Sequence, residues 1–153
     1  MHKIPKVNLI KSGRDCIGVG GGVLIFNKKK ETLLIKRGKN QKNETGFWQK
    51  PGGEVNYGEK VINCMIREVE EETSIKINIW GYLPHTDHII KKDKQHWVAI
   101  NYLGNIKSGR ARVMEPHKHD DVRWFALDKL PKKLNPTTKE SIKNYLNGKY
   151  IKL

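Results

Sequence analysis

Carboxylate side chains gather in one short stretch of this chain, which is otherwise basic. The stretch from position 54 to 72 holds six of the 16 acidic residues: Glu54, Glu59, Glu68, Glu70, Glu71 and Glu72. Clustered carboxylate oxygens suit a hard dication such as Mg²⁺ or Mn²⁺, and Mg²⁺ in proteins commonly bridges a few carboxylates to the phosphates of a substrate. The stretch therefore predicts metal-assisted chemistry on a phosphate compound.

A helix predicted from Glu59 to Thr73 would bring three of these acids together. Side chains three and four residues apart share one face of a helix, so Glu68, Glu71 and Glu72 fall in a narrow arc that we expect to be exposed. A separate apolar stripe can dock on a sheet: Ile62, Met65, Ile66 and Val69. The acids repel one another and oppose the helix dipole, and a bound dication would reverse both penalties. A solvated acidic face is the competing interpretation.

Several neighbours of the acids have types that would support a site. Arg67 stands four residues before Glu71, within reach of an ion pair that would fix the direction of that carboxylate. Gly52 and Gly53 permit close backbone approach, which would offer a carbonyl or an amide to a metal or a phosphate. Glu59 is expected at the start of the helix, where the helix dipole favours an acid.

The same run of residues resembles the Nudix box. That motif reads Gly, five residues, Glu, seven residues, Arg-Glu, an aliphatic residue, any residue, Glu-Glu, any residue, Gly and an aliphatic residue. Its positions are occupied here by Gly53, Glu59, Arg67-Glu68, Val69, Glu71-Glu72, Ser74 and Ile75. Ser74 is the one departure. It affects only the turn that leaves the helix, where a left-handed Ser costs on the order of 1 kcal/mol more than Gly.

The resemblance implies an α/β fold, an α/β/α sandwich with a mixed β-sheet. It also implies that Glu68, Glu71 and Glu72 bind divalent metal together with the Gly53 carbonyl. Glu59 would support the loop or reach the metal through water. The expected metal is Mg²⁺, with Mn²⁺ able to substitute.

The resemblance further implies how the reaction would proceed. Arg67 would orient the catalytic carboxylates, and Glu71 or Glu72 would accept a proton from the water that attacks a nucleotide's diphosphate linkage. The favoured activity is hydrolysis of a nucleoside triphosphate to the monophosphate and pyrophosphate, as in MutT-like relatives.

Candidate residues outside the motif carry open alternatives. Glu115 has the placement of a further metal ligand or base before the last strand, or it is a surface acid. Asp120 and Asp121 would accept hydrogen bonds from a nucleobase edge, or they cap a turn. Lys36 and Arg37, at the end of a strand, would bind phosphate together with Gly52; alternatively, the two cationic side chains are solvated.

Histidine and cysteine usage adds little chemistry. His117 and His119 form a His-x-His pair, but without a third ligand the pair does not predict a zinc site. Cys16 and Cys64 lack any metal-type spacing, so both are expected to be free thiols. Trp48, just before the motif, is expected to pack under the loop rather than to stack on a base.

The elements that must position these residues follow from periodicity and turn signals. We predict a hairpin of strands Gly18–Phe26 and Thr32–Arg37 and a turn at Pro51-Gly52-Gly53. Further strands are expected at Lys76–Tyr82, Thr86–Lys91, His96–Ile106 and Val122–Ala126. A closing helix is expected over Thr137–Asn147, started by Asn135-Pro136 and stopped by Gly148.

Length and charge bound the class of protein. With 153 residues, of which 37% are hydrophobic, the chain is expected to form a single domain over residues 1–153. It has no membrane-length apolar run, and Met1–Lys11 lacks a signal-peptide pattern, so we expect a soluble cytoplasmic protein with no membrane partner. The net charge of +14 favours phosphate-bearing partners or a simple Lys-rich surface.

Competing functions stay open at this stage. Other diphosphates are ADP-ribose or another nucleotide sugar, a dinucleoside polyphosphate, and the 5′ end of an RNA. Nucleic acid is not favoured as a partner, because no aromatic-rich RNA-binding segment is visible. A third hypothesis is an inactive Nudix-fold binding module, which the presence of Arg67, Glu68, Glu71 and Glu72 argues against. The resemblance also allows a homodimer.

Overall fold

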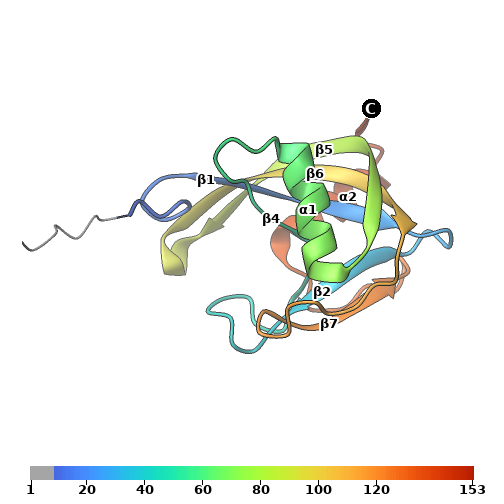
Figure 1. The fold of residues 1–153 in the computed structure, drawn as a ribbon, viewed down its shortest axis with the longest axis horizontal. Helices are drawn as coiled ribbons and strands as arrows, with labels where there is room; N and C mark the ends of the chain where they lie inside the picture. The colour runs from blue at the N-terminus through green and yellow to red at the C-terminus, as the bar shows by residue number, and fades with distance from the viewer. Residues whose placement is uncertain (1–8) are drawn as a thin grey trace, which may run out of the picture.

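The computed structural model describes residues 9–153 as a mixed sheet with a helix on each face (Figure 1). The strands are β1 (Gly18–Phe26), β2 (Thr32–Arg37), β3 (Trp48–Gln49), β4 (Gly52–Glu54), β5 (Lys76–Ile90), β6 (Gln95–Ser108), β7 (His119–Phe125) and β8 (Ile151–Lys152). The helices are α1 (Val61–Thr73), α2 (Pro136–Leu146) and a 3₁₀ turn at Lys91–Asp93. The signal-peptide prediction concerns Met1–Lys11, of which residues 1–8 lie outside the described residues.

The predicted sandwich and its mixed sheet are confirmed. The strand order is β3-β2-β1-β6-β5-β8, with β4 paired to β1 and β7 paired to β2. Strands β1 and β6 run parallel over the whole of β1, from Gly18↔Trp97 to Phe26↔Asn105, and the remaining strand pairs are antiparallel. Because β1 and β6 are far apart in sequence, only the folded chain brings them together.

The predicted hairpin of β1 and β2 is right at its turn and wrong beyond it. The two strands share one register pair, Phe26↔Thr32, and then diverge. Strand β4 takes the place beside β1 that β2 leaves, with Gly21 opposite Gly53 and Gly22 opposite Gly52. The predicted turn at Pro51-Gly52-Gly53 is therefore largely a strand, and it brings the first residues of the motif onto the sheet.

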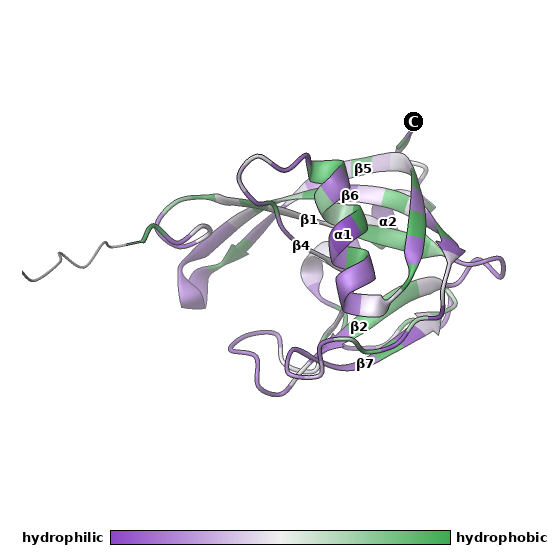
Figure 2. Ribbon diagram, viewed as in Figure 1, coloured by the Kyte–Doolittle hydropathy of each residue, from purple (hydrophilic) through white to green (hydrophobic). Residues whose placement is uncertain are grey.

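Two hydrophobic cores separate the sheet from its helices. The core under α1 consists of Val23, Ile25, Leu33, Cys64, Met65, Val69, Ile75, Ile77 and Tyr102. The core under α2 consists of Leu24, Phe26, Leu83, Leu103 and Ile142. Alternate residues of β1 thus face opposite helices, as the period of a strand requires. Figure 2 shows the apolar residues on the strands between the helices and polar residues along the loops.

The other strand boundaries differ from the predicted ones where pairing with a distant strand decides them. The two strands expected at Lys76–Tyr82 and Thr86–Lys91 form one strand, β5. Its register against β6 shifts at Ile79/Gly81 and again at Leu83/Thr86, and such bulges break the alternation that marks a single strand in sequence. Strands β6 and β7 include the predicted His96–Ile106 and most of Val122–Ala126.

The closing helix α2 is confirmed to within one residue at each end. Asn135 is its N-cap, and the Asn135 side chain accepts a hydrogen bond of 2.9 Å from the Thr138 amide. Pro136 occupies the first helical turn, where it costs no intrahelical hydrogen bond. Neither helix, nor any other within residues 9–153, has the length and apolar character that crossing a bilayer would need.

Candidate active site

Helix α1 begins and ends with residues that are locally unfavourable. It starts at Val61, so the predicted start at Glu59 is wrong by two residues; Lys60 is the N-cap and contributes no side-chain cap. The Glu59 carboxylate is instead directed at Arg67. At the other end Ser74 adopts the left-handed conformation (φ 67°), as expected from its place in the motif, and its amide donates to the Glu70 carbonyl at 2.8 Å.

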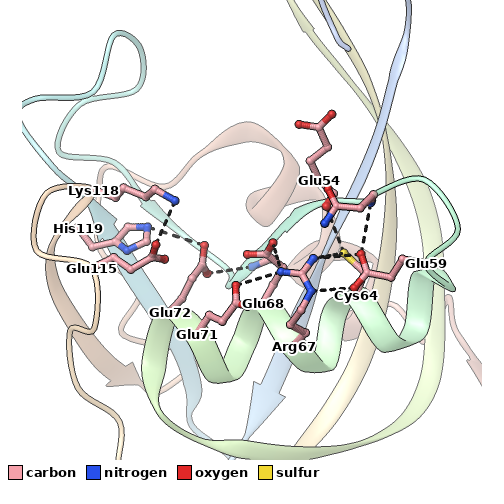
Figure 3. Close-up of polar contacts among 12 residues, drawn as sticks. Glu54, Glu59, Cys64, Arg67, Glu68, Glu71, Glu72, Glu115, Lys118 and His119 are labelled. Atoms are coloured by element: carbon pink, nitrogen blue, oxygen red, sulfur yellow. Dashed lines mark hydrogen bonds and ion pairs between the residues drawn. The ribbon is translucent and has the colours of Figure 1, made fainter. Parts of the chain in front are cut away.

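Arg67 holds three of the motif's carboxylates at once (Figure 3). Its Nε and Nη2 donate to the two oxygens of Glu59 at 2.7 and 3.0 Å. Its Nη1 donates to Glu68 at 2.9 Å and to Glu71 at 3.0 Å. The hydrogen bonds from Arg67 lower the pKa of Glu59 to about 2 despite an opposing effect of desolvation. The expected pair of Arg67 with Glu71 is therefore part of a larger network.

Glu72 lies apart from this network and is buried. The Gly52 amide donates to its Oε2 at 3.2 Å, and the His119 Nε2 lies 3.9 Å from its Oε1. Burial raises the pKa of Glu72 well above its ordinary value, and the nearby Glu68 and Glu115 raise it further. The expectation of a fully exposed acidic face is wrong at Glu72, because β4 and the start of β7 cover it. Ile66, expected on the apolar stripe, is exposed.

His119 and its neighbours complete this end of the site. The His119 ring is buried, burial lowers its pKa to about 4, and its Nδ1 has no hydrogen-bond partner among residues 9–153. Lys118 pairs with Glu115 at 3.1 Å, which raises the pKa of Lys118 (Figure 3). An ion pair would shift both pKa values toward the charged forms of Glu72 and His119, but at 3.9 Å burial outweighs it and shifts both toward the neutral forms.

The donor atoms beside β4 fit a hard cation in type and place. A Cβ added at Gly53 would stand 2.5 Å from the Glu68 carboxyl carbon, so only glycine leaves this carboxylate against the backbone. Glu68 and Glu71 each give Arg67 one oxygen, and the other accepts no hydrogen bond from residues 9–153. In the present side-chain arrangement, no three acidic, His or Cys side chains of that range converge as a ready-made metal centre. The residues therefore fit a metal ion whose binding brings the Gly53 carbonyl and the glutamate side chains together.

A cavity of about 630 Å³ opens beside Glu72. A volume of this size is typical of sites for nucleotide-sized ligands. Glu72, Gly52, Gly53 and His119 line one part of it, and the glycines of β1 with Ala99 and Trp97 of β6 contribute another wall. The remaining wall comes from the loop before β3 and from the N-terminus of α2. The acidic helix therefore contributes one buried carboxylate, Glu72, to a cavity built from the whole sheet.

The residues predicted to bind substrate fall into two groups, which follow the alternation of side chains along a strand. Arg37 and its register partner His119 both line the cavity, as does Gly52. Lys36 and its register partner Asp121 are not among the lining residues, because adjacent strand positions face opposite ways. Asp121 pairs with Arg123 at 2.7 Å. Asp120 also lies outside the lining.

Sequence reasoning missed a group of polar residues at the far side of the cavity. Glu44 accepts from Asn135 at 3.3 Å and lies 2.9 Å from the His88 ring nitrogen. Desolvation opposes ionisation of Glu44, but the contacts with His88, Asn135 and Arg37 prevail and lower its pKa. These partners come from three separate segments, so no local pattern announces them.

Lys50 was missed for a similar reason. It follows Trp48 and Gln49, is 6% exposed, lines the cavity, and its amide donates to Thr138 at 2.9 Å. Burial lowers the pKa of Lys50 to about 7, against the attraction of Glu140 and Glu44. Trp48 itself is buried and packs edge-on against Phe125, as expected. Both cysteines are free thiols, and Cys64 lies in the α1 core.

Known proteins resemble this chain over most of its length. A family model described as the NUDIX domain matches residues 18–145. An RNA pyrophosphohydrolase of Pelagibacter ubique is 36% identical over 71% of this chain and 59% of that protein. A putative 8-oxo-dGTP diphosphatase of Bacillus subtilis is 26% identical over 84% of this chain and 80% of that protein.

The solved structures agree with the sequence relatives. The crystal structure of a MutT Nudix hydrolase from Burkholderia pseudomallei superposes with a TM-score of 0.77 at 40% identity. The match covers 82% of this chain and 95% of that one.

Proposed function

The chain belongs to the Nudix family of hydrolases, and on that premise we propose that it hydrolyses a nucleoside triphosphate to the monophosphate and pyrophosphate with the help of Mg²⁺. The observation that carries the proposal is the position of Glu72. This buried carboxylate lines a cavity large enough for a nucleotide, beside Gly53. Glu68 and Glu71 lie on the same helix, and the Glu68 carboxylate lies against Gly53. Phosphates seated there would lie between the acidic helix and the cationic side chains Arg37 and Lys118.

The metal in this proposal is held by the residues that fit it. Glu68, Glu71 and Glu72 and the carbonyl of Gly53 would supply oxygen ligands, and Mn²⁺ would substitute for Mg²⁺. When bound, the dication polarises the diphosphate and makes water more acidic. Glu59 is assigned a supporting role, because both of its oxygens are taken by Arg67.

We assign the proton acceptor to Glu72 rather than to Glu71, in the ionised form that a bound dication would favour over the opposing effect of burial. Glu72 lines the cavity, whereas the Glu71 side chain is 54% exposed and borders a separate outer hollow. In the proposed step, the oxygen of a water molecule bonds to the α-phosphorus as Glu72 takes a proton from that water. The bond from the α-phosphorus to the bridging oxygen breaks, and that oxygen leaves with pyrophosphate.

The remaining residues position these groups. Arg67 keeps Glu68 and Glu71 directed along the helix through its two hydrogen bonds. Glu115 is paired with Lys118, and its backbone carbonyl accepts from the amides of Lys118 and His119. We therefore assign Glu115 to supporting this loop, which leaves Lys118 to face the phosphates.

A triphosphorylated RNA 5′ end is the second candidate substrate. Two observations favour it: the Pelagibacter relative is named an RNA pyrophosphohydrolase, and the chain carries a net charge of +14. A protein that binds RNA through several phosphates loses affinity steeply as salt rises, whereas a single nucleotide makes few such contacts. The salt dependence of the Michaelis constant thus separates the two candidates.

A phosphate-release screen tests the proposal. Nucleoside triphosphates, ADP-ribose, a dinucleoside polyphosphate and a triphosphorylated RNA are each supplied with Mg²⁺, with pyrophosphatase added to convert pyrophosphate. We expect turnover of nucleoside triphosphates that stops on chelation of the metal and in the Glu72→Gln variant. Turnover confined to RNA or to ADP-ribose would replace the first candidate, and turnover unaffected by Glu72→Gln would remove the assigned proton acceptor.

A further inference from the structure

Lys50 is a buried cation that the proposed reaction does not use. The residue is 6% exposed, its ammonium keeps access to the cavity, and among residues 9–153 that ammonium makes no hydrogen bond and no ion pair. Burying an amine without a partner is costly, and the cost shows in a pKa lowered to about 7. The side chain nevertheless lines the cavity, where a ligand can supply the missing acceptor.

The fold makes room for this side chain. A Cβ added at Gly22 would meet three Lys50 atoms: Cε at 2.8 Å, Cγ at 2.9 Å and Cδ at 3.1 Å. The Lys50 stem therefore packs directly against the backbone of β1 at Gly22, where no side chain intervenes. On its other side the Lys50 amide is held by Thr138 of α2. The backbone of Lys50 is thus held by α2 and its stem packs against β1, which a solvated lysine would not need.

The Lys50 side chain lies on the α2 side of the sheet, because it packs on Gly22, which alternates with Val23 and shares the face that Leu24 presents to the core under α2. The carboxylates that attract it are Glu140 and Glu44. Glu68, Glu72 and Glu115 act instead on Lys118. Since the phosphates must sit beside Glu72 for hydrolysis, the nucleoside end of the ligand extends toward Lys50.

We propose that Lys50 determines base specificity by donating a hydrogen bond to the oxygen at position 6 of a 6-oxopurine. This inference rests on the proposed function, because it takes the orientation of the nucleotide from it. The Lys50 ammonium can only donate, and an acceptor beside it stabilises this charged form, so it matches a base edge that presents acceptors. Guanine and hypoxanthine carry an oxygen at position 6 beside the N7 acceptor, whereas adenine carries an amino donor there. Adenine in the same position would place its amino donor, instead of an acceptor, against the Lys50 ammonium and bring two donors together.

The matched substrates ITP and ATP test this inference, since hypoxanthine and adenine differ at position 6. We expect the wild type to prefer ITP by about 10-fold or more in kcat/KM. Lys50→Met keeps an unbranched stem as far as the ε position and removes the donor, so the preference should fall to within about 3-fold with ATP turnover retained. An unchanged ratio, or an equal loss for both nucleotides, would overturn the assignment; the equal loss would place Lys50 on the phosphates or ribose.

Two further variants test whether the preference depends on the position of the Lys50 side chain. Gly22→Ala leaves Lys50 in the chain but displaces its stem, so it should also lower the ITP preference. Lys42→Met is the matched control, because Lys42 lines the same cavity from an exposed loop position, and the ratio should stay unchanged. Thermal melting of each variant checks that it folds.

Binding separates this inference from the proposed function. Calorimetric titration with IMP and AMP requires no turnover. A preference for IMP that Lys50→Met abolishes would support the inference even if no triphosphate were hydrolysed. Equal affinities for IMP and AMP in the wild type would overturn it even if hydrolysis proceeded as proposed.

Discussion

The two helices border the same cavity, but their terminal residues differ in how well they suit the ends of a helix. Helix α2 has an N-cap whose side chain accepts a hydrogen bond, a proline in its first turn and a left-handed glycine, Gly148, two residues beyond its end. Helix α1 has no side-chain cap, no acid in its first turn, no base in its last turn and a left-handed serine where glycine would cost less.

This difference shows where function constrains the sequence. The glutamates of α1 lie near its C-terminus, where the helix dipole disfavours them, because that end faces the cavity. Helix α2 supplies its buried Thr138 to hold the backbone of Lys50, and its sequence agrees with its structure at each end. Consistency between local preference and fold is expected wherever a functional site does not override it.

The largest expected effect is that of Glu72→Gln on activity. Losing the proton acceptor should lower kcat by about 10²-fold or more, as general-base removal typically does. Stability should be unchanged or higher, because burial already disfavours the charged carboxylate. Initial rates of phosphate release and urea denaturation measure the two. Glu70→Gln, on an exposed position of the same helix, is the control with wild-type rates. A loss of stability without a loss of rate would make α1 an ordinary structural helix.

The next effect concerns Lys50, beside α2, and has a defined pH dependence. Its pKa is about 7 in the folded protein and near the ordinary 10.5 when unfolded, so between these values the unfolded chain binds more protons and stability rises with pH. Lys50→Met should therefore stabilise the protein by on the order of a few kcal/mol at or below pH 7, and by less toward pH 10. Urea denaturation without nucleotide measures this. Lys42→Met should show no such trend, and a gain independent of pH would mean that Lys50 is not buried as a cation.

Asn135→Ala tests how much the N-cap of helix α2 contributes to stability. The variant loses the cap to the Thr138 amide and the contact with Glu44, so we expect a loss of about 1–2 kcal/mol in the free energy of unfolding. Asn147→Ala at the other end of α2 is the matched control, because the Asn147 side chain makes no hydrogen bond with residues 9–153. If the two variants were equally stable, the Asn135 cap would contribute nothing and the contrast between the helices would weaken.

Ser74→Gly has the smallest expected effect. Glycine adopts the left-handed conformation without strain, so the variant should gain up to about 1 kcal/mol in stability and keep its activity. Chemical denaturation and initial rates provide the measurements. Ser108→Gly, at the end of the extended strand β6, should show no gain. A destabilised Ser74→Gly would show that the serine side chain makes a compensating contribution.

Much of the fold was predictable because its signals are local. Asn135-Pro136 and Gly148 bound α2 correctly, to within one residue at each end. Errors arose where a partner strand decided the outcome. The divergence of β2 from β1 depends on β4 and β7, and the unity of β5 depends on its long pairing with β6.

The sequence by itself determined the chemistry of α1: the spacing of Arg67, Glu68, Glu71 and Glu72 within one helix follows from helical geometry alone. Only the tertiary structure decided the environment of each group. It buried Glu72 against Gly52 and His119, directed Lys36 and Asp121 away from the cavity, and left the Lys50 ammonium without a hydrogen-bond partner among residues 9–153. The physical reason is that the solvation and partners of a side chain are set by segments distant in sequence, whereas helical spacing is set by the nearest few residues.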